Sequence, residues 1–310
     1  MKLTFLLSFL LFSFITFGQE LKWIPFNWFG GNISGKYYDK LGIVIPVSID
    51  SLSYHFVMQL DLGAETAVIN GNTIAPYLDE YNDLKNKLDT SLKVRIKGHE
   101  NYKFKGINLK LGNVSLGNVN IGYFKNFGKA LSKDSIKSKA TKFIGVIGTD
   151  IFQDKILVID YKNKRICVAE KLPERFEDAN FKFFKKTKDN RIKIPMNIDG
   201  NEEDLLFDTG SSLFALITNK ERAEKISNKK IIDSLNINNW GEYFTVYGER
   251  VNTEIKFGEK QLAPTLVYFD KQRRFDKFFE DEKIWGITGN AYFLNNIIII
   301  DYKNDRFGIK

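Results

Sequence analysis

Hydrophobic and polar residues alternate along much of this chain, which is the pattern of strands with one buried face. Over residues 42–50, Ile or Val recurs at every second position, and mostly smaller or polar residues lie between them. Residues 297–300 form a continuous β-branched run, which is typical of a strand buried on both faces. Helix is predicted only for part of residues 72–88 and for residues 219–227, the latter capped by Thr218. The pattern therefore predicts an all-β fold.

The chain also repeats itself, because four segments recur in the same order in its two halves. The paired segments are residues 45–50 and 194–199, 56–69 and 205–217, 111–124 and 257–269, and 143–166 and 284–307. Spacing within the last segment is kept, since twelve residues separate Gly148 from Asp160 and also Gly289 from Asp301. This order at near-equal spacing indicates an internal duplication.

The duplication predicts two pseudo-symmetric lobes with a cleft between them, formed by residues 19–172 and residues 173–310. Pro173 and a run of charges interrupt the pattern at the boundary. Matching Asp-Tyr-Lys-Asn segments begin at Asp160 and Asp301. They predict tight turns between strands, with Asn in left-handed geometry.

Each half carries one Asp-x-Gly sequence at the end of an apolar strand. The two are Asp61-Leu62-Gly63-Ala64 and Asp208-Thr209-Gly210-Ser211. A single copy is typical of a simple turn. Two copies in matching positions of a duplicated chain predict that a pseudo-twofold axis brings the carboxylates together. Two carboxylates about 3 Å apart share one proton, so one can act as a general acid while the other acts as a base.

The scarcity of cysteine and histidine excludes several other kinds of chemistry. Cys167 is the only cysteine, which excludes an intramolecular disulfide, a cysteine-based zinc site and an iron–sulfur cluster. His55 and His99 are the only histidines, so a histidine-rich metal centre is excluded. A serine hydrolase would have to use one of them, and the chain has no Gly-x-Ser-x-Gly sequence. We predict no metal and no cofactor.

The charges of the chain do not favour a nucleic-acid partner. The net charge of +8 arises from 46 basic and 38 acidic residues that are mixed along the 310 residues. The densest basic stretch, residues 182–193, is interpreted as a solvated connection. Residues 30–37 resemble a phosphate-binding loop, but Tyr37 stands where Ser or Thr is needed and no apolar strand precedes them. We interpret this segment as a Gly-rich loop.

The first residues have the pattern of a secretory signal peptide. Lys2 precedes an apolar run over residues 3–17, and Gly18 precedes a polar change at Gln19. The run is shorter than the ~20 residues that a membrane-spanning helix needs, so no stable membrane anchor is predicted. We expect residues 1–18 to be a signal peptide and the protein to be exported to the periplasm or secreted. Its oligomeric state stays open.

On these motifs the chain resembles the aspartic proteases. Residues 205–211 match the strand-Asp-Thr-Gly-Ser sequence of that family. Residues 146–152 and 287–290 resemble its hydrophobic-hydrophobic-Gly element, which passes beneath the catalytic loop. The residues of these motifs are similar to those of bacterial retropepsin-like proteins, and two lobes fused in one chain give a pepsin-like layout.

The resemblance implies roles for individual residues. Asp61 and Asp208 are the expected catalytic pair, and the flap is expected in the hairpin over residues 94–105. The aromatic hydroxyl of that flap is expected from Tyr102, with His99 as the alternative. Supporting roles are also implied for four residues next to the aspartates: Gly63 and Gly210 allow tight backbone, Thr209 ties the two loops together, and Ser211 binds Asp208.

One position departs from the family pattern, because Leu62 stands where Thr or Ser is expected. Leu62 removes half of the hydroxyl network that ties the two loops together. The first hypothesis is therefore an exported aspartic endopeptidase that cuts peptides or unfolded protein. The alternative is a catalytically weakened or inactive protein of the same shape that binds peptide.

Overall fold

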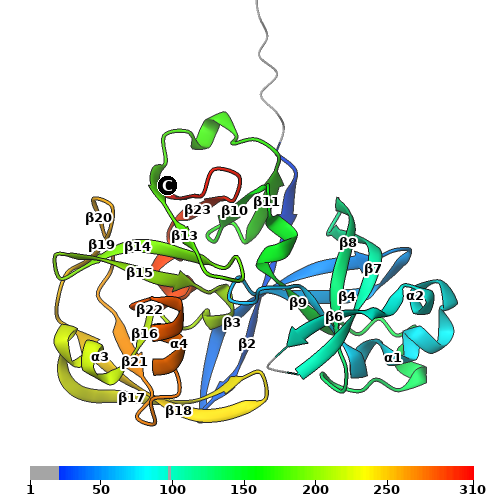
Figure 1. The fold of residues 1–310 in the computed structure, drawn as a ribbon, viewed down its shortest axis with the longest axis horizontal. Helices are drawn as coiled ribbons and strands as arrows, with labels where there is room; N and C mark the ends of the chain where they lie inside the picture. Colours follow the sequence, from blue (N-terminus) through cyan, green and yellow to red (C-terminus); the bar gives the residue numbers. More distant parts are fainter. Residues whose placement is uncertain (1–20, 97–98) are drawn as a thin grey trace, which may run out of the picture.

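The first half of the chain forms an eight-stranded sheet, shown on the right of Figure 1. The computed structural model describes residues 21–96 and 99–310, so the predicted signal peptide lies outside the described residues. The alternation predicted over residues 42–50 is confirmed, since every second side chain from Ile43 to Ile49 is buried. In sheet order, the strands are β2 (Asn27–Ile33), β3 (Lys36–Ile49), β4 (Leu52–Leu60), β9 (Lys142–Ile147), β5 (Val68–Asn70), β8 (Val114–Phe124), β7 (His99–Leu111) and β6 (Leu88–Ile96).

The second half forms a ten-stranded sheet on the opposite side of the molecule (Figure 1). Nine of its strands follow one another, and β13 (Lys185–Lys186) pairs with β14 away from this path. The nine are, in order, β17 (Ser227–Asn239), β18 (Glu242–Val251), β21 (Leu266–Phe269), β16 (Leu216–Thr218), β22 (Gly286–Thr288), β15 (Asn201–Phe207), β14 (Ile192–Ile198), β19 (Ile255–Phe257) and β20 (Lys260–Gln261).

The two sheets share one strand order. The sequence β4-β9-β5-β8-β7-β6 in the first corresponds to β15-β22-β16-β21-β18-β17 in the second. Parallel pairing occurs at the same places, between β4 and β9 and between β5 and β8, and likewise between β15 and β22 and between β16 and β21. The long hairpin β6–β7 therefore has a counterpart in β17–β18. The repeated sequence has produced a repeated topology.

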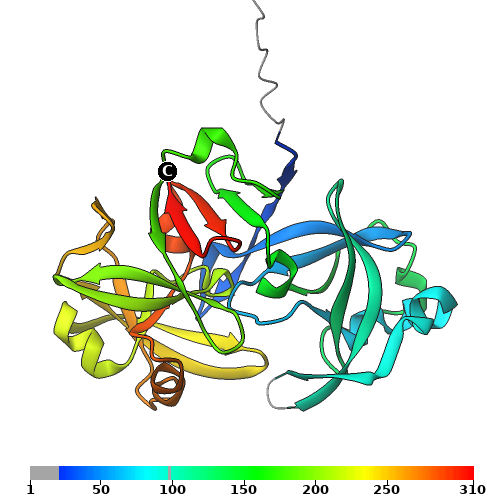
Figure 2. The ribbon, with the colours of Figure 1, turned by 45° about the horizontal axis from the view of Figure 1, so that its top comes forward.

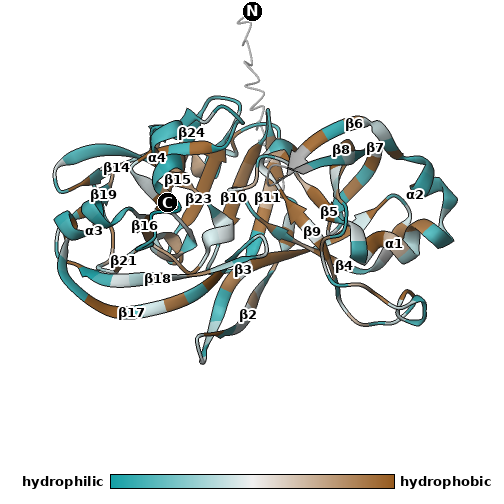
Figure 3. Cartoon of the chain, turned by 60° about the horizontal axis from the view of Figure 1, so that its bottom comes forward, coloured by the Kyte–Doolittle hydropathy of each residue, from teal (hydrophilic) through white to brown (hydrophobic). Residues whose placement is uncertain are grey.

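A third sheet joins the two halves and lies between them (Figure 2). At its centre β10 pairs antiparallel with β23, with Val158 opposite Ile299. The side chains of Ile298, Ile299 and Ile300 are completely buried, which confirms a strand covered on both faces. Hydrophobic segments gather along β10 and β23 in Figure 3. The six strands are β1 (Trp23–Pro25), β11 (Arg165–Ala169), β10 (Ile156–Asp160), β23 (Ile297–Asp301), β24 (Arg306–Ile309) and β12 (Asn180–Phe183).

Helices are short and lie at the margins of the sheets. Helix is confirmed within residues 72–88, where α1 (Gly71–Glu80) and α2 (Asn82–Asn86) follow one another. The predicted cap of α3 is wrong, because Thr218 belongs to β16 and its hydroxyl donates to the Trp285 carbonyl, 2.5 Å away. Asn219 caps the helix instead, accepting a hydrogen bond from the Arg222 amide. The α-helices are α1 (Gly71–Glu80), α2 (Asn82–Asn86), α3 (Lys220–Ile226) and α4 (Asp276–Glu282), and the 3₁₀ helices are Lys133–Ser135, Thr149–Phe152, Glu174–Phe176, Thr209–Ser211 and Asn290–Phe293.

The structure also corrects the predicted geometry of the Asp-Tyr-Lys-Asn turns. The residues with positive φ are Lys164 and Asp305, not the asparagines before them. Asn163 is held by Asp160, whose carboxylate accepts from its backbone amide at 3.1 Å and its side-chain amide at 2.8 Å. The same two bonds recur in the second turn. The next residue therefore makes the left-handed step.

Residues 30–37 belong to the hairpin that β2 and β3 form, and they include the end of β2, the turn and the start of β3. This corrects their interpretation as a loop. The hairpin reaches the second half of the chain, where the Ser34 hydroxyl accepts a hydrogen bond from the Asn236 amide at 2.9 Å. Ile33 and Tyr38 pack against the hydrophobic core beside the second sheet. Part of residues 19–172 thus contacts the second half directly. In the described ranges, no helix has the length and apolar character needed to cross a bilayer.

Candidate active site

The two Asp-x-Gly sequences meet where the first and second sheets face each other. We call residues 61–64 the first acid loop and residues 208–211 the second acid loop; they follow β4 and β15. A Cβ atom added to Gly63 would lie 2.7 Å from Oδ2 of Asp208. One added to Gly210 would lie 2.5 Å from Oδ1 of Asp61. Each carboxylate therefore lies against the glycine of the other loop, where no side chain fits.

Neighbouring strands hold both acid loops in place. The Asp61 amide donates to the Ile147 carbonyl at 3.0 Å, and the Asp208 amide donates to the Thr288 carbonyl at 2.9 Å. These acceptors end β9 and β22, the strands that pair in parallel with β4 and β15. The strands continue beneath the loops through glycine, and a Cβ atom on Gly289 would lie 2.7 Å from the Phe214 carbonyl. The aspartates thus take equivalent places in the two repeats.

The second aspartate receives more hydrogen bonds from its own loop than the first. Oδ1 of Asp208 accepts from the Gly210 amide at 2.8 Å and the Ser211 amide at 3.2 Å, and Oδ2 accepts from the Ser211 hydroxyl at 2.7 Å. Oδ1 of Asp61 accepts from the Gly63 amide at 3.1 Å. The second acid loop therefore fixes the orientation of its carboxyl through more contacts than the first acid loop does.

The surroundings of Asp61 favour its protonated form. Burial, the charge of Asp208 and a hydrogen bond with Asp208 together raise the pKa of Asp61 well above its ordinary value of 3.8. Burial acts most strongly because it removes water from the charged form. A carboxyl that stays protonated beside a second carboxyl can donate a proton, which is one half of general acid–base chemistry.

This raised pKa predicts how stability changes with pH. The folded protein keeps the Asp61 proton at pH values where the unfolded chain has lost it, so this contribution is complete below about pH 3.8 and declines as the pH rises through the raised pKa. We expect the urea midpoint of the wild type to fall relative to that of Asp61→Asn over this window. Urea unfolding of both proteins from about pH 3 to about pH 8 measures it. A difference that stays constant with pH would contradict the assignment.

Thr209 ties the two acid loops together in one direction. Its hydroxyl donates to the Leu60 carbonyl at 2.8 Å and accepts from the Leu62 amide at 2.9 Å, so it binds the backbone on both sides of Asp61. Leu62 holds the equivalent position in the first loop but has no hydroxyl, and its side chain is fully buried. The hydrogen bonds that a hydroxyl at position 62 would make to the second acid loop are therefore missing.

The flap candidates are not brought to the aspartates by any contact among the described residues. Tyr102 lies inside the β6–β7 hairpin, opposite Lys93 on one side and Tyr123 on the other. The Lys93 ammonium lies 4.4 Å from the centre of its ring. The side chain of His99 lies outside the described part of the structure.

An aromatic contact that was not predicted from the sequence joins the two halves. Trp240, in the β17–β18 turn, lies with its ring 6.1 Å from that of Phe124 and 5.9 Å from that of Phe127. It belongs to one apolar cluster with Ala64 of the first acid loop and Val94 of β6. Figure 2 shows the tip of the β17–β18 hairpin pointing toward the first sheet. An aromatic residue at a hairpin turn is a sequence signal that could have pointed to this contact.

A second missed residue, Asn290, supports the second acid loop from below. Its side-chain amide donates to the Thr209 carbonyl at 3.2 Å and to the Ser212 hydroxyl at 2.9 Å. Its oxygen accepts from the Tyr161 hydroxyl at 2.6 Å, and Tyr161 follows β10 in the first half. Asn290 is the last residue of the predicted glycine element over residues 287–290, and that place was the available signal for its role.

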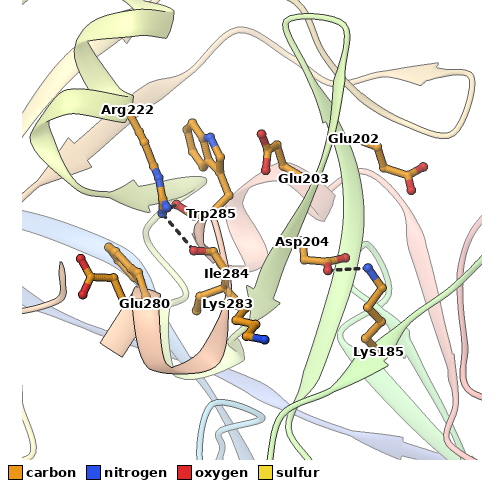
Figure 4. A pocket seen from close by; sticks show the side chains of 10 residues that line it. Lys185, Glu202, Glu203, Asp204, Arg222, Glu280, Lys283, Ile284 and Trp285 are labelled. Atoms are coloured by element: carbon orange, nitrogen blue, oxygen red, sulfur yellow. Dashed lines mark hydrogen bonds and ion pairs between the residues drawn. The ribbon is translucent and has the colours of Figure 1, made fainter. Parts of the chain in front are cut away.

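A separate cavity of about 430 Å³ opens beside the second sheet and is shown in Figure 4. It lies between β15 and the end of α4, and neither Asp61 nor Asp208 lines it. Its lining mixes both signs of charge, and the Lys185 ammonium is already paired with Asp204 at 2.7 Å. Within residues 21–96 and 99–310, no group of three or more His, Cys, Asp or Glu side chains is arranged to hold a metal. The aspartate pair is therefore the stronger candidate for chemistry.

Comparison with known proteins adds no family assignment. No family model matches the chain, and the search of curated proteins gave no match.

Proposed function

We propose that this protein is an aspartic endopeptidase whose two halves are the lobes of an aspartic protease. The observation that carries the proposal is the reciprocal placement of Asp61 and Asp208, each against the glycine of the other loop. The repeated strand order around the two loops supports it, because it presents both carboxyls in equivalent positions. A shared-proton pair needs no metal, cofactor or nucleophilic side chain to hydrolyse an amide.

The proposed reaction uses one water molecule. Asp208 takes a proton from that water while the water oxygen bonds to the peptide carbonyl carbon. At the same time, neutral Asp61 donates its proton to the carbonyl oxygen. The result is a tetrahedral diol, with the proton now on Asp208. Collapse of the diol breaks the carbon–nitrogen bond as Asp208 protonates the leaving amine, and a hydroxyl proton returns to Asp61. The pair ends with the single proton it began with.

The substrate we propose is an extended peptide or a segment of unfolded protein. Both sheets send a long hairpin toward the acid loops, and the apolar cluster of Val94, Phe124 and Trp240 lies beside Ala64. Such a surface suits an apolar substrate side chain, since burying aromatic area is favourable. Action in the periplasm or outside the cell is part of this proposal.

Cleavage of a diverse peptide mixture tests the proposal. We expect products from the mature protein within the range from about pH 3 to about pH 8, and we expect a statine-type transition-state analogue to block their formation. The matched control is a peptide that has the analogue's sequence but lacks its hydroxyl. Cleavage that both peptides leave unaffected would point to a contaminating protease and contradict the proposal.

The alternative function is peptide binding without cleavage. The observation that favours it is Leu62, because a fully buried leucine removes one of the two ties between the loops. Binding proteins need a cleft but no proton transfer. A protein that binds the statine-type peptide and the control peptide equally well and cuts neither would support this alternative.

A further inference from the structure

An arginine from the second half of the chain reaches the first acid loop. Arg191 ends the turn between β13 and β14, and Nη1 of its guanidinium donates to the Gly63 carbonyl at 3.4 Å. Its side chain is only 14% exposed. Gly63 in turn donates its amide to Oδ1 of Asp61, so a single residue separates Arg191 from the Asp61 carboxyl.

The guanidinium is held rigidly before it reaches Gly63. Its Nε and Nη2 bind the Asp189 carboxylate at 2.8 and 2.7 Å, a two-point arrangement that fixes the plane of the group. The guanidinium also lies over the Phe278 ring of α4, with its Cζ atom 5.1 Å from the ring centre. Its Nη2 lies 3.9 Å from Oε1 of Glu282. A side chain held from three directions can fix the backbone that it touches.

The same turn contacts the first acid loop region a second time. Glu65, which follows Ala64 directly, forms a hydrogen bond with Asp189. Burial and this bond raise the pKa of Glu65, so Asp189 can keep the charge that faces Arg191. The turn over residues 187–191 is therefore attached to the first acid loop at Gly63 and to Glu65, the residue that follows this loop.

These contacts fall where the hydroxyl tie is missing. The Thr209 hydroxyl binds the Leu60 carbonyl and the Leu62 amide, but the Leu62 side chain has no hydroxyl to return a hydrogen bond to the second acid loop. We propose that Arg191 is a positioning residue that replaces this missing tie and holds Asp61 at its working distance from Asp208. The inference rests on the proposed function, because the working distance is that of the catalytic pair. It implies that Leu62 is tolerated because Arg191 is present.

A double-mutant cycle between positions 191 and 62 tests the inference. Arg191→Met keeps the length of the side chain but removes its hydrogen bonds, and we expect kcat to fall about 100-fold with little change in KM, since a shift of about 1 Å at reacting groups has that effect. Arg191→Lys keeps the charge and should recover part of the loss. Leu62→Thr should raise kcat at least tenfold in the Arg191→Met protein and change the wild type less than about threefold.

Arg222 supplies the matched control. Its Nη1 also binds backbone carbonyls, those of Ile284 and Trp285 at 2.9 and 2.7 Å, but away from the acid loops. Arg222→Met should leave kcat of the folded protein within about threefold of the wild type, and Leu62→Thr should not improve it. If Leu62→Thr fails to improve Arg191→Met, or improves both arginine variants equally, the inference is overturned.

The cycle has a second readout that does not depend on cleavage. If the wild type cuts no peptide, the proposed function fails. The wild type, Leu62→Thr, Arg191→Met and the double variant are then compared by urea unfolding. A tie shared between the two positions predicts that Leu62→Thr lowers the urea midpoint less in the Arg191→Met protein than in the wild type. Equal shifts in the two backgrounds would overturn the role of Arg191 whatever the outcome for the protease activity.

Discussion

Asp208→Asn is expected to lower kcat for peptide cleavage by about 10³-fold or more, because it removes the base that takes the proton from water. The loss should lie in kcat with little change in KM, since the substrate contacts the hairpins as well as the pair. Asparagine can still accept the Gly210 and Ser211 amide bonds at Oδ1, so the loop should keep its fold. Single-turnover cleavage of one peptide by both proteins measures the effect.

A buried aspartate outside the pair provides the control. Asp160 is the last residue of β10, where burial acts to raise its pKa but hydrogen bonds from Asn163 and the Arg165 ion pair hold the pKa below its ordinary value. Asp160→Asn should lower stability and leave kcat of the folded protein unchanged. If Asp208→Asn cleaves as fast as Asp160→Asn, the pair is not the catalytic machinery.

Much of the framework could be predicted because it is written in local patterns. The alternation over residues 42–50 and the β-branched run at 297–300 predicted strands that the structure contains. The repeated Asp-x-Gly sequences predicted that Asp61 and Asp208 come together. In the structure, each of these carboxyls lies against the glycine of the other loop, at Gly210 and Gly63. A duplication helps here, because a pair that is distant in sequence occupies equivalent positions in two copies of one motif.

Contacts without a counterpart in the other half could not be predicted in this way. The bond from Arg191 to Gly63 joins residues 128 positions apart, and no repeated motif marks either end. Trp240 meets Phe124 only because the β17–β18 hairpin spans the distance between the sheets. The direction of Tyr102 depends on hairpin register, in which a shift of one residue turns a side chain to the opposite face.

Glycine-rich sequence misled the interpretation of residues 30–37 for a different physical reason. Glycine can provide flexibility, but it can also provide room for a neighbour. A Cβ atom on Gly30 would lie 2.5 Å from the Tyr37 hydroxyl and 2.9 Å from the Tyr38 carbonyl, both on the partner strand. Close packing within a hairpin therefore explains this glycine, and sequence alone does not separate the two uses.

The glycines of the acid loops lead to the second large expected effect. Gly63→Ala should place a methyl group 2.7 Å from Oδ2 of Asp208, and Gly210→Ala should place one 2.5 Å from Oδ1 of Asp61. Neither carboxyl can stay in place, so each variant should lose at least about 100-fold in kcat through misplacement of about 1 Å. Peptide cleavage by the folded fraction, determined by circular dichroism, measures the loss.

Gly31→Ala is the matched control, because the nearest atom to its added methyl is the flexible end of Leu41, 3.3 Å away. It should keep kcat within about threefold of the wild type. Since the two close approaches are reciprocal, both loop variants must lose activity for one shared pair to do the chemistry. If Gly63→Ala loses activity and Gly210→Ala keeps it, Asp61 need not lie against the second loop. A single working carboxyl, rather than a shared proton, would then have to account for cleavage.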